Sequence, residues 1–343
     1  MKQRLTNLDV LRGLAALAVC AFHFDLGGKL GVDVISSVTK FGYLGVDIFF
    51  VISGFVIPFA MERTNYRIKD AGYFLAARFF RLYPAYFAAA FLSVGLWFLS
   101  TKIPGFQGAL PSFSFQEILA NIFLLCDFQN EKWLIPVFWT LAIEAQYYLL
   151  IAASYGGLNC KKPIVSYLIL SAWIVAPIFI GQGPTVFTWT ALFAMGILCH
   201  MVKSKKIPNT AAVVFMSVAF FAHTVTKGWE SGLVGILSAA CILYLPNIPS
   251  RSLIWIGSIS YSLYLLHIPL GVRVVTFSDR LHFSNYPLGW LVVGFCAFAF
   301  SIVSAAIFFN FIEMPSHRLS RKVGSIRDFK KKVLNGAESL NSD

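Results

Sequence analysis

The sequence has 343 residues, of which 57% are hydrophobic and 16% aromatic, but only 13% are charged. This composition excludes a soluble globular domain, because a chain of this length could not bury so much apolar surface, and it indicates a protein that lies in lipid. The formal net charge of +12 would favour a nucleic-acid partner in a soluble protein. Here the basic residues lie between apolar runs, so we expect no nucleic-acid binding.

Apolar runs follow one another along the whole chain, and each is about as long as a helix that crosses roughly 30 Å of hydrocarbon. They predict an all-α, polytopic transmembrane bundle of about ten spans, at residues 8–26, 41–60, 79–100, 134–154, 163–180, 185–202, 211–226, 232–247, 252–272 and 287–312. We expect residues 1–315 to form this membrane domain and residues 316–343 to form a basic, partly disordered cytosolic tail.

Lys and Arg are distributed unequally between the two sides of this predicted bundle. Of the 28 basic residues, 21 lie on the side that carries both ends of the chain and seven lie on the other side. Cytoplasmic loops retain positive charge during membrane insertion. The pattern therefore predicts that both termini are cytosolic and that the number of spans is even.

The first span carries two ionisable residues that share a helix face. A charge in hydrocarbon costs at least about 2.5 kcal/mol, so each one needs a partner or a task. Arg12 and His23 are eleven residues apart, which is close to three full turns and a rise of about 16 Å. This spacing sets Arg12 at the cytosolic interface and His23 in the outer half of the membrane, and it suggests a path through the protein. A snorkelling arginine and a hydrogen-bonded core histidine explain the pair equally well.

Two carboxylates lie within later spans. Asp47 enters the second span from the outer side, at a depth that could match His23, and a carboxylate beside an imidazole strengthens it as a base. Alternatively, Asp47 lies in a wet outer vestibule. Glu144 lies in the middle of the fourth span, where it either pairs with Arg12 or Arg81 or faces a polar cavity and handles protons or substrate.

Basic and imidazole side chains also lie near the predicted membrane surfaces. Arg78 and Arg81 are three residues apart at the mouth of the third span, and on a helix they share a face. Two guanidinium groups suit a phosphate, although a topology-setting positive cluster explains them as well. His267 lies about 16 residues beyond the cytosolic Arg251, so it also reaches the outer half and could share a vestibule with His23.

These residues lie in six stretches of fixed order: LDVLRGLAALAVCAFHF, GYLGVDIFFVISGF, RFFRLYPAY, FWTLAIEAQYYLL, ISYSLYLLHIPL and NFIEMP. In order and spacing the stretches resemble the acyltransferase 3 family, the polytopic enzymes typified by bacterial O-antigen and exopolysaccharide O-acetylases. The likeness covers nearly the whole chain. Arg12 and His23 have the family's Arg-x10-His spacing, and Arg78 and Arg81 form its Arg-x-x-Arg.

The resemblance implies a membrane-embedded O-acyltransferase, which we expect in the bacterial cytoplasmic (inner) membrane. Such an enzyme moves an acyl group, usually acetyl from acetyl-CoA on the cytosolic side, to a hydroxyl of a glycan or glycolipid. The implied partners are the lipid bilayer, acyl-CoA as the donor substrate and a saccharide acceptor. No bound cofactor is implied, and no metal is expected, because no span carries His, Cys or carboxylate pairs at ligand spacing.

The resemblance also implies roles for individual residues. Arg78 and Arg81, together with Arg12, would hold the phosphates of coenzyme A. His23 would take the proton of the acceptor hydroxyl as general base, oriented by Asp47.

Three further residues complete the predicted site. Glu144, which matches the family's motif glutamate, would assist the base or hold the acceptor sugar. His267 and Ser53 are the candidate residues of the acceptor vestibule, although packing of a small residue between helices is the interpretation that we favour for Ser53. The motif around Glu144 reads TLAIEAQ, where many members have a second acidic residue, so Glu144 is expected to be the only carboxylate there.

A proton-coupled exporter of a small metabolite or lipid-linked sugar is the alternative function. It would use His23, Asp47 and Glu144 as a proton path, but it does not account for the arginine pair. Some family members carry a soluble esterase-like domain after the last span, and we expect none in this chain. We therefore expect transfer to be completed within the membrane domain or by a partner.

Overall fold

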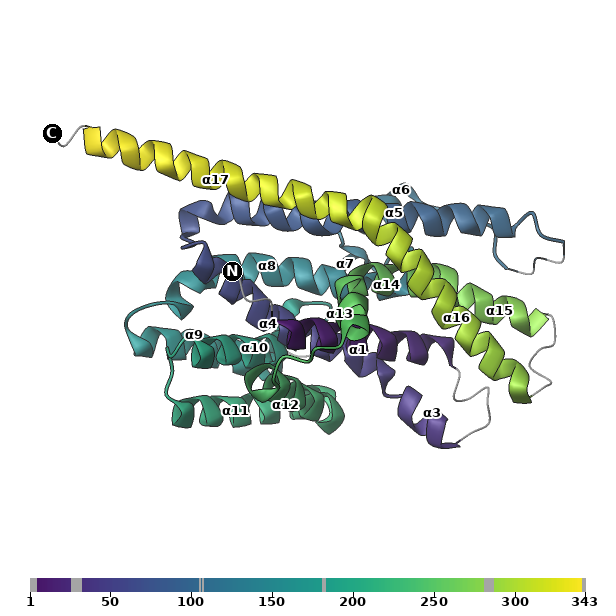
Figure 1. Ribbon diagram of the computed structural model, residues 1–343, viewed down its shortest axis with the longest axis horizontal. Helices are drawn as coiled ribbons and strands as arrows, with labels where there is room; N and C mark the ends of the chain where they lie inside the picture. The colour runs from purple at the N-terminus through teal and green to yellow at the C-terminus, as the bar shows by residue number, and fades with distance from the viewer. Residues whose placement is uncertain are drawn as a thin grey trace.

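The computed structural model describes residues 5–25, 33–104, 106, 108–180, 183–280 and 287–340, and these form helices joined by turns, with no strand among them (Figure 1). The helices are α1 (Thr6–Phe24), α3 (Asp33–Thr39), α4 (Gly45–Arg63), α5 (Ala71–Ser100), α6 (Phe115–Ile122), α7 (Cys126–Gln129), α8 (Trp139–Leu158), α9 (Pro163–Ile180), α10 (Thr190–Lys203), α11 (Asn209–Lys227), α12 (Trp229–Tyr244), α13 (Arg251–Ser258), α14 (Ser260–Leu266), α15 (Arg273–Arg280), α16 (Pro287–Phe308) and α17 (Met314–Leu340). Short π-helical turns follow α14 at His267–Val272 and α16 at Phe309–Glu313. The predicted all-α class is confirmed.

Each predicted apolar run coincides with a helical segment. Within the described ranges, eight helical segments are long and apolar enough to cross a membrane, and there are nine if α13 and the segment after it form one span bent by 58°. The run expected at 232–247 is α12, an apolar helix that is shorter than the other spans. The protein is therefore a polytopic helical membrane protein, while the count of about ten spans and the side of each terminus stay predictions.

Helix α10 lies at the centre of one half of the bundle, packed against α4, α9, α11 and α12. Each of its residues from Thr190 to Met201 is buried, as expected for a helix that is apolar on every face. Its closest neighbour is α4, because glycines lie at the crossing. A Cβ atom on Gly54 would overlap the carbonyl oxygen of Phe193, and one on Gly196 would overlap that of Val51. Small residues let two helices in a membrane approach this closely.

The C-terminal segment differs from the sequence expectation. We expected a partly disordered tail, but α17 is helical from Met314 to Leu340 and packs along α5. Pro315 does not stop this helix, and the helical backbone runs without a break from α16 through the π-helical turn at Phe309–Glu313 into α17. The expected domain boundary at residues 315 and 316 therefore falls inside a helix.

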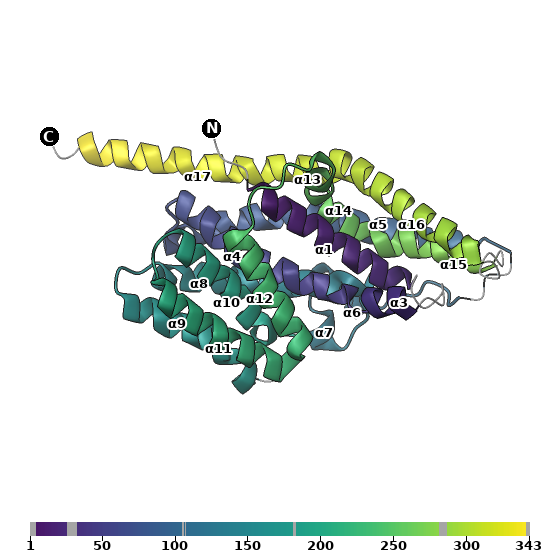
Figure 2. The same ribbon diagram turned by 60° about the horizontal axis from the view of Figure 1, so that its bottom comes forward.

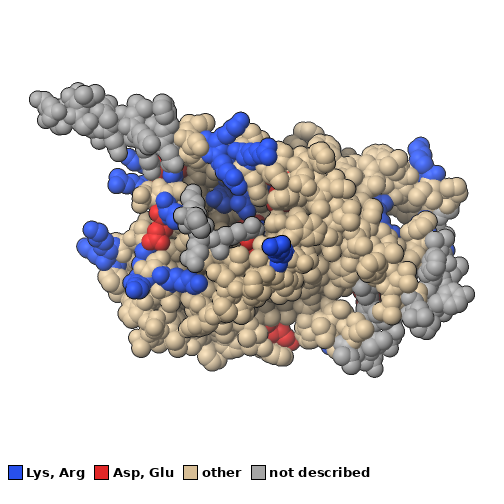
Figure 3. Space-filling model, in the orientation of Figure 1, with Lys and Arg blue, Asp and Glu red and all other residues tan. Residues whose placement is uncertain are grey.

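Charge is concentrated at one end of the bundle. Figures 1 and 2 show α17 projecting from the end at which α1 begins, and Figure 3 shows most of the visible Lys and Arg side chains near that end, with a largely uncharged flank beyond it. This arrangement agrees with the charge bias on which the predicted cytosolic position of both termini rests.

Candidate active site

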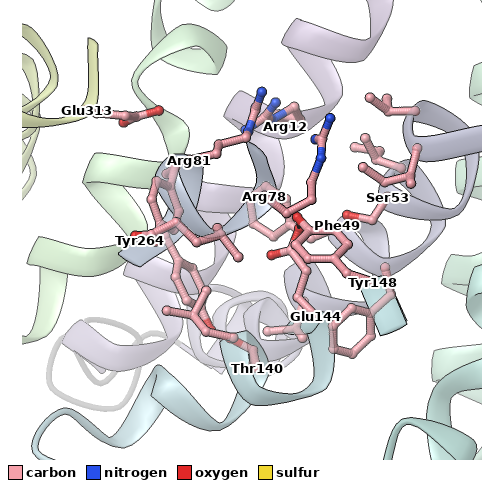
Figure 4. Close-up of a pocket in the computed structure, with 18 residues that line it drawn as sticks. Arg12, Phe49, Ser53, Arg78, Arg81, Thr140, Glu144, Tyr148, Tyr264 and Glu313 are labelled. Carbon is pink, nitrogen blue, oxygen red and sulfur yellow. Dashed lines mark hydrogen bonds between the residues drawn. The ribbon is translucent and has the colours of Figure 1, made fainter. Parts of the chain in front are cut away.

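Three arginines line one cavity, which we call the arginine cavity. It has an empty volume of about 870 Å³ and is lined by Arg12 from α1 and by Arg78 and Arg81 from α5. The two α5 residues share a face because they are three positions apart. Figure 4 shows the three guanidinium groups gathered above Glu144 and Tyr148 in that view.

Arg78 lies over aromatic rings rather than against a carboxylate. The guanidinium carbon of Arg78 lies 5.4 Å from the ring centroid of Phe74 and 5.9 Å from that of Tyr148, within the range of cation–π attraction. Among the described residues, none of the three guanidinium groups forms an ion pair with a carboxylate. The cavity therefore offers three positive groups to an anionic ligand, for which guanidinium forks are well suited.

Two carboxylates line the same cavity. Glu144 accepts a hydrogen bond from the hydroxyl of Tyr148, one helical turn further along α8. Glu313 is almost fully buried, and one of its oxygens accepts hydrogen bonds from the backbone N–H (3.1 Å) and the hydroxyl (2.5 Å) of Ser262. The ion pair that we weighed for Glu144 with Arg12 or Arg81 is not formed among the described residues. Glu144 instead faces the cavity.

A second cavity, the histidine cavity, has an empty volume of about 730 Å³. His23 from α1, Asp47 from α4 and Ser231 from α12 line it. Lys227 and the indole rings of Trp139 and Trp189 also line this cavity.

The hydrogen bonds around His23 show which nitrogen of its neutral imidazole ring carries the hydrogen. The carbonyl of Tyr264 can only accept, so the Nδ1 of His267, 2.7 Å away, carries a hydrogen and its Nε2 is an acceptor. The Nδ1 of His23 lies 3.0 Å from the carbonyl of Val19 and 3.3 Å from that Nε2, so it also carries a hydrogen. In its neutral form, His23 therefore has its lone pair on Nε2, which no described residue uses.

The two cavities adjoin each other. Along α4, Asp47 lines the histidine cavity, Ser53 lines the arginine cavity, and Val46 lines both. Along α8 the order is the same, with Trp139 in one cavity and Glu144 in the other.

Tyr264 is the second residue that lines both cavities. Its hydroxyl lies 2.9 Å from the Oγ1 of Thr140 and 3.3 Å from the carbonyl oxygen of Val137. The cavities are therefore stacked along the axis of the bundle, with Val46 and Tyr264 between them.

The predicted site residues fall into these two groups. Arg12, Arg78 and Arg81 are brought together with Glu144, and His23 is brought together with Asp47. His267 lies next to His23, with ring centroids 4.9 Å apart, but its side chain is fully buried and does not line the histidine cavity as the expected vestibule residue would.

Two expectations need correction. The carboxylate of Asp47 does not contact His23, because its Oδ2 accepts a hydrogen bond from Ser231 at 2.6 Å while the imidazole of His23 is turned toward His267. Ser53 is not a neighbour of His267 in an acceptor vestibule. It lines the arginine cavity, and its backbone carbonyl accepts a hydrogen bond from Tyr147 at 3.3 Å.

Several residues of the two cavities were missed in the sequence. Tyr148 follows Glu144 by four residues and Tyr264 precedes His267 by three, so helical spacing within the quoted motifs could have found both. Ser231 and His223 lie in no motif. Ser231 reaches the cavity wall because α12 packs against α4, and His223 contacts Ser231 because α11 packs against α12.

Comparisons with known proteins show the family of the chain. Residues 5–308 match a family model of acyltransferase 3, described as an acyltransferase domain. The peptidoglycan O-acetyltransferase OatA of Listeria monocytogenes is 27% identical over 381 residues, which cover 96% of this chain and 58% of that protein. The O-acetyltransferase OatA of Staphylococcus aureus is 26% identical, over 91% of this chain and 57% of that protein. The chain thus spans a little over half the length of these relatives, and no solved structure matches it.

Proposed function

The chain belongs to the acyltransferase 3 family, and on that premise we propose that it is a membrane O-acyltransferase that moves an acetyl group from cytosolic acetyl-CoA to a hydroxyl of a glycan or glycolipid. One observation carries the proposal. A cavity with three arginines adjoins a cavity in which a histidine offers an unused Nε2 lone pair. The first suits an anionic donor and the second suits removal of a proton from an acceptor.

The arginine cavity is the donor site in this proposal. Coenzyme A carries several phosphate groups, and Arg12, Arg78 and Arg81 offer guanidinium groups that form no ion pair with a described carboxylate. Glu144 lines this cavity rather than that of His23, so we assign it to the donor side. There its charge, held by Tyr148, would orient the guanidinium groups.

The acyl group reaches the acceptor past Val46 and Tyr264, which form the common wall. His23 then acts as general base through Nε2. The acceptor oxygen attacks the thioester carbonyl carbon, the new C–O bond forms, the C–S bond breaks, and the hydroxyl proton passes to His23. Coenzyme A leaves as a thiol when its sulfur takes up this proton from His23, which returns the imidazole to its neutral form. His267 holds the ring of His23 so that Nε2 faces the cavity.

The acceptor class rests on the relatives. Both relatives described above are named for O-acetyl transfer, and that of Listeria is named for peptidoglycan. We propose a glycan of the bacterial envelope as the acceptor and the bacterial cytoplasmic membrane as the location. The exporter alternative has no support from the family or from these relatives.

The test is transfer of label from radiolabelled acetyl-CoA by membranes that contain the wild-type protein or His23→Ala at matched expression. We expect label in a glycan or glycolipid fraction with the wild type, and a rate at least about 100-fold lower with the variant, because a general base contributes about that much. Near-normal transfer by His23→Ala would exclude His23 as the base. If the wild type moves no label, the proposed activity is wrong.

A further inference from the structure

Three buried polar side chains from three helices form a hydrogen-bonded chain in the wall of the histidine cavity. The hydroxyl of Ser231 on α12 lies 2.6 Å from the Oδ2 of Asp47 on α4 and 2.7 Å from the Nε2 of His223 on α11. Asp47 and Ser231 are each 4% exposed, and His223 is fully buried. Burial of such groups is costly unless they are hydrogen-bonded to one another.

The proton positions in this chain follow from its ends. A carboxylate can only accept, so the one hydroxyl hydrogen of Ser231 points to Asp47. The Oγ of Ser231 must then accept from His223, which places a hydrogen on the Nε2 of that ring. Each donor therefore points toward the carboxyl group of Asp47, and the chain holds this group in one orientation as a hydrogen-bond acceptor.

The second oxygen of Asp47 is available to the cavity. No described residue donates a hydrogen bond to its Oδ1, and this atom is not among the buried polar atoms that lack a partner. Because Asp47 lines the cavity, its free acceptor oxygen is reached from the cavity side.

The wall of the histidine cavity also contains aromatic side chains. The rings of Trp139 and Trp189 lie 5.5 Å apart at an angle of 34°, and both line the cavity. A sugar presents an apolar ring face that stacks on indole and hydroxyls that donate to carboxylates. The cavity offers both kinds of partner.

We propose that Asp47 binds the acceptor, with Oδ1 accepting a hydrogen bond from a hydroxyl of a saccharide that lies against the indole rings. Ser231 and His223 are positioning residues that fix the carboxylate for this contact. The inference rests on the proposed function, since it needs a saccharide acceptor. It separates Asp47 from His23, which keeps the task of taking the proton.

The structure offers a matched control on the same helix. Ser238 is also on α12 and is 3% exposed, but its hydroxyl donates only to the carbonyl of Val234 in its own helix, at 2.7 Å. Ser231→Ala and Ser238→Ala remove the same atom from the same helix. Only the first removes a contact of Asp47.

The experiment measures acetyl transfer in membranes at matched expression while two concentrations are varied in turn: acetyl-CoA, and an envelope glycan fraction from the host. For Ser231→Ala we expect the glycan concentration at half-maximal rate to rise about tenfold, as for loss of a hydrogen bond to a charged group, with an unchanged value for acetyl-CoA. Ser238→Ala should leave both values within about twofold of wild type, and Ser231→Thr, which keeps the hydroxyl, should restore the glycan value.

Other outcomes contradict the inference in separable ways. If Ser231→Ala leaves the glycan concentration at half-maximal rate unchanged, the inference is wrong while the proposed function stands. The same holds if this concentration and that of acetyl-CoA shift equally. If Ser231→Ala does not reach the membrane, His223→Leu, which removes the donor to Ser231, must give the same selective shift and His223→Gln must not. No transfer by the wild type overturns both the inference and the proposed function.

Discussion

The arginines of the arginine cavity differ in their surroundings, and this decides which substitution is informative. Arg78 lies over two rings, and its Nε is buried without a hydrogen-bond partner among the described residues. A planar guanidinium stacks on such rings and still presents its terminal nitrogens to a phosphate. A lysine ammonium at this position would lose both the stacking and the fork.

We therefore predict that Arg78→Lys raises the acetyl-CoA concentration at half-maximal rate about tenfold, although the positive charge is kept. The matched control is Arg63→Lys, because Arg63 also lies 5.4 Å from a ring, that of Phe59, but does not line the cavity. The measurement is the rate of label transfer at varied acetyl-CoA. Equal behaviour of the two variants would remove Arg78 from the donor site.

At the scale of single residues, the sequence predicted which residues line the two cavities better than which of these residues contact one another. Spacing on one helix places Arg12 and His23 at different depths, and it pairs Arg78 with Arg81, because helix geometry alone decides both. The partner of Asp47 depends on how α12 packs against α4, which no local pattern encodes. For this reason the expected pair of Asp47 with His23 is not formed, whereas His23 and His267, which were expected at a similar depth, are in contact.

The helices that hydropathy and length determine could be predicted from the sequence. Features that depend on packing between helices were harder to predict. Each apolar run became a helix because lipid leaves the backbone no other way to satisfy its hydrogen bonds. The bend of 58° between α13 and α14 left no mark in the hydropathy. The helical C-terminal segment was also missed, since its composition is that of a solvated tail, whereas α17 is a helix that packs against α5.

The crossing of α4 and α10 gives a prediction at this scale. Gly196→Ala places a methyl group against the backbone carbonyl of Val51, which cannot move as a side chain end would. We expect a loss of about 1–3 kcal/mol of stability, the usual cost of overpacking. It would be measured as a lower temperature of aggregation of the detergent-solubilised protein.

The control for this variant is Gly95→Ala on α5, where a Cβ atom would meet nothing within 4 Å. That change should leave the aggregation temperature equal or higher, because alanine favours a helix over glycine. If the two variants behave alike, the close approach of α4 and α10 is not what limits the size of residue 196.

In the proposed mechanism the protein moves an acetyl group from one side of the membrane to the other, so its orientation in the membrane is part of the proposal. The charge bias predicts that Lys161 lies on the cytosolic side and Lys132 on the outer side. Both side chains are exposed. In a background that carries Cys160→Ser, we expect Lys132→Cys in intact cells to react with a membrane-impermeant thiol reagent, and Lys161→Cys to react only after the membrane is opened. Reaction of both in intact cells would refute the orientation.

The central claim is that the donor enters from the cytosolic face and the acetyl group leaves on the other. The most direct measurement uses sealed vesicles of the two orientations, each containing envelope glycan and given radiolabelled acetyl-CoA from outside only. Inverted vesicles, whose outer surface is the cytosolic face, should label the glycan, and right-side-out vesicles should not. Vesicles with His23→Ala set the background. Equal labelling in both orientations would contradict a donor cavity that opens to the cytosol.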